Sequence, residues 1–216
     1  MPTLAEQGQI SIHIQGLSKV YGRERIVKDF SYQFEALSNT AVTGANGSGK
    51  STLLKLLAGM VVADSGEISY KGTTQEIAPE HIYRQISYCA PAQSLIEEFT
   101  LKEMLAFHLK FRSLSQGMTP DELLKLAYFE GDINKKISMF SSGMKQRMKL
   151  ALALFTDTPV LMLDEPTTNM DEHGCNWYKE QIIKMVNKRL IIIASNQLHE
   201  YEFCNNLIRL EDYKRH

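Results

Sequence analysis

Residues 44–52 read Gly-Ala-Asn-Gly-Ser-Gly-Lys-Ser-Thr, and this run constrains the fold more than any other part of the chain. It fits the pattern G-x-x-x-x-G-K-[ST] of a phosphate-binding loop, which connects a strand to a helix. The flanks agree, because residues 39–43 read as a short strand and residues 51–60 as a buried helix. The run therefore predicts an α/β fold with a phosphate site where that strand ends.

The residue types in this loop suit a polyphosphate and its metal ion. Glycines let successive backbone N–H groups turn inward and hold phosphate oxygens. Lys50 adds a positive charge at the β- and γ-phosphates, and the Ser51 hydroxyl is placed to ligate Mg²⁺. The positive end of the following helix dipole would face the same phosphates. The predicted nucleotide contacts are Gly44, Ala45, Asn46, Gly47, Ser48, Gly49, Lys50, Ser51 and Thr52.

Composition and charge argue against several other classes of protein. The 216 residues carry 24 Lys and Arg against 25 Asp and Glu. This balance gives no support for nucleic-acid binding, which requires a basic face. No apolar run approaches the roughly 20 residues needed to cross a bilayer, and no signal peptide is recognisable at the N-terminus. Three distant cysteines fit the reduced thiols of a cytoplasmic protein.

A second motif supplies the carboxylates that such a site needs. Residues 160–163 are apolar, and Asp164 and Glu165 follow them directly. A short apolar run of this kind indicates a strand that is buried on both faces of a parallel sheet. Ligands of open α/β folds bind at the carboxyl ends of such strands. There Asp164 can hold the Mg²⁺ shell while Glu165 faces the γ-phosphate.

A third motif, residues 140–147, reads Phe-Ser-Ser-Gly-Met-Lys-Gln-Arg. Ser141 or Ser142 can cap a helix whose apolar residues recur at helical spacing. The polar residues expected largely on the opposite side are Lys145, Gln146, Arg147 and Lys149. One interpretation is an amphipathic helix with a serine cap, and the other is a second helix N-terminus that faces a phosphate.

With these motifs in this order, nearly the whole chain resembles the ATP-binding cassette (ABC) family. Residues 140–144 resemble its signature, usually Leu-Ser-Gly-Gly-Gln, and residues 167–171 resemble its D-loop. Asp164 and Glu165 resemble the Walker B aspartate and catalytic glutamate, and Tyr21 resembles the aromatic residue that stacks on adenine. The resemblance implies that the chain binds ATP and Mg²⁺ and hydrolyses ATP, with Lys50 and Glu165 among the catalytic residues.

The resemblance also implies an architecture. It predicts a P-loop NTPase core with a parallel sheet and a small antiparallel β-subdomain, formed by residues 1–92 and 144–216, and an inserted α-helical subdomain over residues 93–143. Expected strands are residues 10–14, 31–34 and 68–70 in the β-subdomain, and 190–194 and 207–210 in the core. Thr100 predicts the start of a helix that reaches Phe111, and Thr119-Pro-Asp-Glu122 predicts the start of another.

Two cassettes of this family close head to tail on two ATP molecules. The resemblance therefore implies that Ser141 and Gly143 act in trans, on the γ-phosphate held by a second cassette, and that a monomer is inactive. A homodimer is expected. The helical subdomain of the family docks a membrane partner. The chain is therefore expected to be a peripheral cytoplasmic subunit that works with a separately encoded integral membrane subunit.

Two positions depart from the pattern of the family. Its hinge usually carries a Gln that touches Mg²⁺, and here Pro91 stands at that place, with Gln93 two residues on. Gln93 can take the place of that hinge Gln only if the loop is slightly shifted. Asn196 stands where a histidine senses the γ-phosphate; asparagine donates an amide hydrogen bond but cannot become cationic. His199, three residues on, is the alternative sensor.

The predicted function is the ATP-binding and ATP-hydrolysing subunit of an ABC transporter. The chain ends soon after its last expected strand, which favours an export-type system. Two other functions stay open. One is a soluble ABC ATPase outside transport, although such proteins usually hold two cassettes or a long coiled coil. The other is a regulatory cassette that binds ATP and turns it over slowly, an interpretation that Asn196 keeps open and Glu165 argues against.

Overall fold

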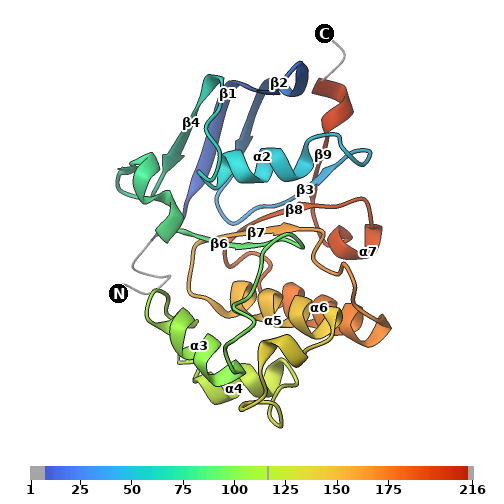
Figure 1. Ribbon diagram of the computed structural model, residues 1–216. Helices are drawn as coiled ribbons and strands as arrows, with labels where there is room; N and C mark the ends of the chain where they lie inside the picture. Colours follow the sequence, from blue (N-terminus) through green and yellow to red (C-terminus); the bar gives the residue numbers. More distant parts are fainter. Residues whose placement is uncertain (1–7, 116, 214–216) are drawn as a thin grey trace.

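Two sheets and a group of helices make up the part of the chain that the computed structural model describes, residues 8–115 and 117–213. The antiparallel sheet lies at one end in Figure 1, and α2 separates it from the parallel sheet. On the opposite face of the parallel sheet lie α5 (Ser142–Phe155) and α6 (Glu172–Ile183), with α3 (Leu101–Leu109) and α4 (Pro120–Leu126) beyond them. The predicted α/β fold class is confirmed, with a parallel sheet and a small antiparallel one.

The parallel sheet has the strand order β6-β7-β8-β3-β9. Its strands are β3 (Asn39–Thr43), β6 (Ile86–Cys89), β7 (Val160–Asp164), β8 (Leu190–Ala194) and β9 (Asn206–Arg209). Every residue of β7 and β8 is buried, as expected for central strands covered on both faces. The last strand begins and ends one residue earlier than predicted, because Leu210 already belongs to the 3-10 turn η3 (Leu210–Tyr213).

The antiparallel sheet has the order β2-β1-β4-β5. It consists of β1 (Ser11–Tyr21), β2 (Glu24–Phe34), β4 (Ser65–Lys71) and β5 (Glu76–Ile77). The three strands predicted here are fragments of longer ones. Register shifts between β1 and β2 interrupt the alternation of buried and exposed residues, so the sequence pattern shows only part of each strand.

The helices begin where their caps predict. Thr100 opens α3 (Leu101–Leu109) and Thr119 opens α4 (Pro120–Leu126), each with a complete capping box. Ser141 caps α5 (Ser142–Phe155), where its Oγ accepts from the Met144 N–H at 3.2 Å. The remaining helices are α2 (Lys50–Leu57), α6 (Glu172–Ile183) and α7 (Leu198–Tyr201), and the other 3-10 turns are η1 (Pro79–Arg84) and η2 (Ile137–Met139).

One predicted helix face is wrong. Gln146 was expected among the polar residues on the outer side of α5, yet it is only 2% exposed. Its Nε2 donates to the carbonyl of Pro166 at 2.8 Å, so α5 contacts the segment that follows Glu165. In the sequence Gln146 stands between Lys145 and Arg147, and this local pattern does not indicate that its partner is Pro166.

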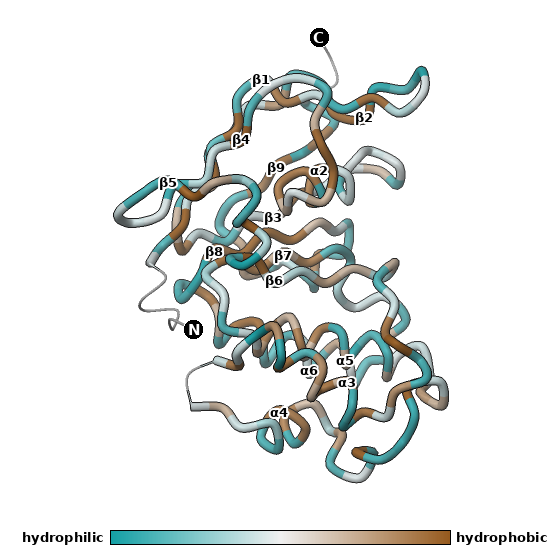
Figure 2. Tube along the Cα trace, turned by 60° about the vertical axis from the view of Figure 1, so that its left-hand side comes forward, coloured by the Kyte–Doolittle hydropathy of each residue, from teal (hydrophilic) through white to brown (hydrophobic). Residues whose placement is uncertain are grey.

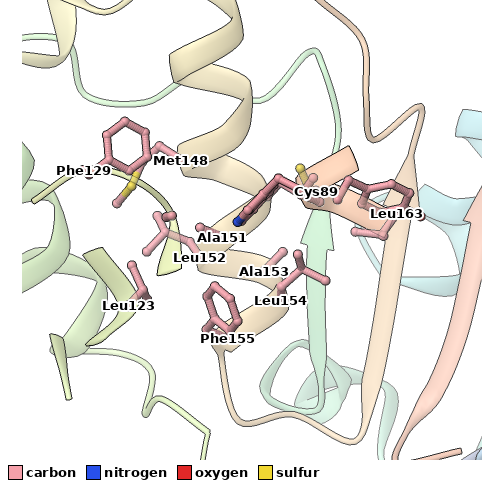
Figure 3. Close-up of a cluster of buried hydrophobic side chains, with 14 of the residues drawn as sticks. Cys89, Leu123, Phe129, Met148, Ala151, Leu152, Ala153, Leu154, Phe155 and Leu163 are labelled. Atoms are coloured by element: carbon pink, nitrogen blue, oxygen red, sulfur yellow. The ribbon is translucent and has the colours of Figure 1, made fainter. Parts of the chain in front are cut away.

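Two hydrophobic clusters lie on either side of the parallel sheet. Figure 2 shows hydrophobic residues in α2, between the sheets, whereas the loop beside β5 is hydrophilic. In the other cluster, shown in part in Figure 3, Leu152 and Phe155 of α5 lie near Leu123, while Cys89 and Leu163 come from strands. Among the described residues, no helix is long and apolar enough to cross a membrane.

A buried arginine holds the C-terminal end of α5, whose last carbonyls lack partners within the helix. Arg189 is 2% exposed, and its guanidinium donates to the Leu154 carbonyl at 2.6 Å and the Thr156 carbonyl at 3.2 Å. Burial lowers its pKa to about 10, which leaves it charged at pH 7.

Arg189→Met should lower the free energy of unfolding by about 3 kcal/mol, because two buried carbonyls lose a charged donor. Urea unfolding of the purified variant measures this value. Lys188→Met is the matched control, since Lys188 is exposed and adjacent. A stability equal to that of the control would contradict the assigned role.

Candidate active site

The loop between β3 and α2 has the backbone that a phosphate-binding loop requires. Gly44, Gly47 and Gly49 have φ angles of +149°, +78° and +103°, which L side chains rarely adopt. A Cβ on Gly49 would also lie 2.8 Å from the carbonyl oxygen of Ile26, which passes directly over the loop. Glycine at this position is therefore required by both backbone angle and space.

A pocket of about 280 Å³ lies over this loop and α2. It brings together residues from three distant parts of the chain: the β1–β2 hairpin, the loop itself and the residue that follows β7. The residues that line it are Tyr21, Ile26, Asn46, Gly47, Ser48, Gly49, Lys50, Ser51, Thr52 and Glu165. Tyr21 is 49% exposed at its mouth, with the Lys19 ammonium 5.4 Å from its ring centre.

Lys50 opens α2 with its side chain folded along the loop. It is 5% exposed, and its Nζ donates to the carbonyls of Gly44 at 2.7 Å and Ala45 at 3.3 Å. The ammonium therefore lies over the first turn of the loop, where it adds positive charge to the inward-facing N–H groups.

Asp164, at the end of β7, offers an oxygen that could bind a metal ion. The carboxylate is 5% exposed, and its Oδ1 has no hydrogen-bond partner among the described residues. Burial raises its pKa, while a hydrogen bond with Ser51 acts in the opposite direction. A hydroxyl and a carboxylate that are hydrogen-bonded to each other fit Mg²⁺. This ion takes one or two protein oxygens and completes its shell with phosphate and water.

Glu165 follows in an unusual conformation, with φ of 42°. Its N–H donates to the carbonyl of Ala194 at 2.9 Å, so the ladder between β7 and β8 continues to this N–H and the backbone bends at Glu165 itself. The carboxylate lines the pocket, and Thr168 Oγ1 lies 3.4 Å from its Oε2. The bend places two consecutive carboxylates in different surroundings, Asp164 buried beside Ser51 and Glu165 facing the pocket.

Asn196 contacts the phosphate loop directly. Its Oδ1 accepts from the Gly44 N–H at 3.1 Å and its Nδ2 donates to Asn46 Oδ1 at 3.3 Å. The alternative residue, His199, contacts a different segment: its Nε2 is 3.0 Å from Thr167 Oγ1. Neither Asn196 nor His199 lines the pocket. The Thr167 N–H and hydroxyl also donate to Glu200, a fully buried carboxylate.

Gln93 lies apart from the phosphate loop. Its Oε1 accepts from the Ala90 N–H at 3.0 Å, and Lys149 Nζ donates to the carbonyls of Ala90, Pro91 and Gln93 at 2.9–3.2 Å. This closed turn lines a different hollow of about 450 Å³, together with residues such as His108. Gln93 thus lines a different hollow from the pocket that Ser51 lines.

Ser141 and Gly143 also lie outside the pocket, at the exposed start of α5. A Cβ on Gly143 would be 2.9 Å from the carbonyl oxygen of Asn169, so glycine allows the start of α5 to approach the loop after Glu165. These two residues cannot be assigned to the nucleotide held by the phosphate loop of the same chain.

Three residues at or near the site were missed by the sequence analysis. Ile26 covers Gly49, Gln146 holds Pro166, and Glu211 accepts from the Ala45 N–H at 2.5 Å. Only Glu211 had a usable signal, because it is a carboxylate soon after the last apolar strand, much as Asp164 is a carboxylate at the end of β7.

Comparisons with known proteins agree with this geometry. Residues 27–168 match the ABC transporter family model. The Nod factor export ATP-binding proteins I of Rhizobium etli and Rhizobium johnstonii are 29% and 30% identical over 93% and 94% of this chain, which spans 65% and 67% of their lengths. A solved dimeric ATP-binding cassette in a post-hydrolysis state with ADP and Pi matches 92% of this chain and 93% of its own, with a TM-score of 0.75 at 20% identity.

Proposed function

The chain belongs to the ABC transporter family, and from this premise we propose that it powers an exporter as a subunit separate from the membrane-spanning one. ATP-binding cassettes of this family are ATPases, so ATP is the substrate. The observation that carries the proposal is the single pocket in which Tyr21, the phosphate loop and Glu165 meet. Export is supported by the curated relatives, which are described as export ATP-binding proteins.

We assign the steps of hydrolysis to these residues as follows. Tyr21 stacks on adenine, and the N–H groups of residues 44–52 together with the Lys50 ammonium bind the phosphates. Ser51 and Asp164 would hold Mg²⁺, which would offset the negative charge of the phosphates. Glu165 orients the attacking water and accepts its proton. Gln93 has no part in this assignment, because its amide is bonded to Ala90.

A second cassette would complete the site. Ser141 and Gly143 are at the start of α5, outside the pocket of their own chain, as a role in trans requires. The solved cassette described above is dimeric, and we propose a homodimer of this chain with the same head-to-tail closure. A helix N-terminus would then face each γ-phosphate from the opposite subunit.

The proposed membrane subunit fits the hollow of about 450 Å³ between the strand end of β6 and α3. Two of the residues that line it are exposed, Tyr83 at 54% and Met60 at 55%. For this reason we place the chain at the cytoplasmic face of the membrane. Residues 93–143 would be the helical subdomain that docks the membrane subunit, and residues 1–92 and 144–216 would form the core and the β-subdomain. Of the other functions considered, Asn196 favours only the slow regulatory cassette.

Two measurements on the full-length chain test this function. MgATP binding and steady-state phosphate release by the purified protein should both be detectable, and affinity purification from solubilised membranes should recover an integral membrane protein. Absence of MgATP binding would refute the nucleotide site. Binding and turnover without any membrane partner would instead favour an ABC ATPase outside transport.

Asn196 should limit the rate of hydrolysis. It can donate a neutral hydrogen bond to a γ-phosphate oxygen, and charge-assisted bonds are about twice as strong. Asn196→His should therefore raise turnover, and Asn196→Ala should lower it by removing a donor and the bond to the Gly44 N–H. Turnover of the unchanged chain should show no pH dependence from a histidine at this position.

His199→Ala is the matched comparison for Asn196→Ala. Because His199 is bonded to Thr167, whereas Asn196 is bonded to the phosphate loop, replacing His199 should leave the pH profile unchanged. If His199→Ala slows hydrolysis while Asn196→Ala does not, the sensor is His199. If both variants match the unchanged chain, neither residue senses the γ-phosphate.

A further inference from the structure

The phosphate loop is flanked on both sides by residues from the C-terminal part of the chain. β3, which precedes the loop, lies between β8 and β9 and is parallel to both. The carboxyl ends of all three strands therefore meet at one edge of the sheet. Asn196 lies two residues beyond β8, and Glu211 lies two residues beyond β9. Sheet order thus brings one polar side chain to each side of the loop.

These two side chains hold consecutive amides of the loop. Asn196 Oδ1 accepts from the Gly44 N–H at 3.1 Å, and Glu211 Oε1 accepts from the Ala45 N–H at 2.5 Å. The carbonyls of the same two residues, Gly44 and Ala45, accept from Lys50. The first turn is therefore held through its carbonyls by Lys50 and through its amides by residues that lie outside the pocket lining.

The approach of Glu211 also depends on Gly44. A Cβ on Gly44 would lie 3.0 Å from both carboxylate oxygens of Glu211, so a larger residue would push the carboxylate away. Hydrogen bond and packing together make two separate contacts between Glu211 and the first turn. A bond to an ionised acceptor is roughly twice as strong as a neutral one, so this contact is the stronger of the two that hold the amides.

We propose that Glu211 is a positioning residue of the phosphate loop: its carboxylate holds the Ala45 amide and keeps the first turn in the conformation that binds a nucleotide. When Lys50 engages phosphate, its bonds to the loop carbonyls are shared or lost, and the outer contacts keep the turn in place. Apparent affinity falls in proportion to the fraction of molecules in the competent conformation. The proposal rests on the nucleotide site proposed above.

The test compares Glu211→Ala, Glu211→Gln and Asp212→Ala in the full-length chain. Alanine removes the acceptor, glutamine keeps an acceptor oxygen without the charge, and Asp212 is the exposed neighbouring carboxylate. Equilibrium binding of MgATP should weaken about tenfold in Glu211→Ala, the scale of one lost charged hydrogen bond. Glu211→Gln should weaken binding less than Glu211→Ala does, because its amide oxygen still accepts but the bond is neutral. Asp212→Ala should bind as well as the unchanged chain, and kcat at saturating ATP should change little in all three.

Hydrogen exchange adds a readout that general destabilisation would not produce. Exchange of the Ala45 amide should speed up about tenfold in Glu211→Ala and stay protected in Glu211→Gln, while amides in β7 keep the same protection in both. Equal MgATP affinity in Glu211→Ala and the unchanged chain would overturn the inference, as would equal losses in the alanine and glutamine variants. If the unchanged chain binds no MgATP, the nucleotide function itself is wrong.

Discussion

Lys50→Ala should lower ATP turnover at least about 10²-fold, the scale for removing one donor that stabilises the transition state. The ammonium already lies over the first turn of the loop, 2.7 Å from the Gly44 carbonyl, and it reaches a phosphate by rotating away from that oxygen. The side chain is 5% exposed, so it is not the solvent-facing residue that a ligand contact suggests. Phosphate release at saturating MgATP measures the loss.

A control is needed because Lys50 also bonds the loop. Lys71→Ala removes an exposed lysine on β4 and should leave turnover unchanged. Circular dichroism and thermal unfolding should show that Lys50→Ala keeps its fold, because the hydrophobic clusters on both sides of the sheet do not include Lys50. A Lys50→Ala protein that hydrolyses ATP at the original rate would refute the assignment of the nucleotide site.

Local sequence signals predicted the elements that position the phosphate loop. β3 and β8 have the predicted bounds, and the caps at Thr100 and Thr119 begin their helices as expected. These features depend on a few neighbouring residues: a buried apolar run, or a hydroxyl followed three residues later by Glu. α2 is shorter than predicted because Gly59, with φ of +69°, follows its C-cap.

Features that depend on distant partners could not be predicted in this way. Gln146 was expected on the outer side of its helix, but its amide is buried against Pro166. Gln93 was expected at the metal ion, and its turn is held by a distant residue, Lys149 of α5, whose Nζ donates to the carbonyls of Ala90, Pro91 and Gln93. Glu211 had a sequence signal as a carboxylate after the last strand, but its partner Ala45 was found only once the sheet order placed β9 beside β3. Each of these contacts joins segments whose approach is set by topology, which the local pattern of residues does not contain.

Glu165→Gln should stop the chemical step while leaving ATP binding intact. The substitution keeps the shape of the side chain and removes the carboxylate that accepts the proton of the attacking water. Loss of a general base costs about 10²–10⁴ in rate, so phosphate release should fall by at least about 10²-fold. The backbone at this position already has φ of 42°, which glutamine adopts no less readily than glutamate. Glu180→Gln, an exposed residue of α6, is the control.

Because ATP binds and is not consumed, the closed dimer should accumulate in Glu165→Gln. Size-exclusion chromatography with MgATP should show a dimer for this variant and a monomer when ATP is omitted. The contact requires Ser141 and Gly143 of one chain to face the nucleotide of the other, so adding Ser141→Arg should return the variant to a monomer. A Glu165→Gln protein that stays monomeric at high concentration in MgATP would contradict the head-to-tail dimer. Unchanged turnover would exclude Glu165 as the general base and leave the activation of water to another residue.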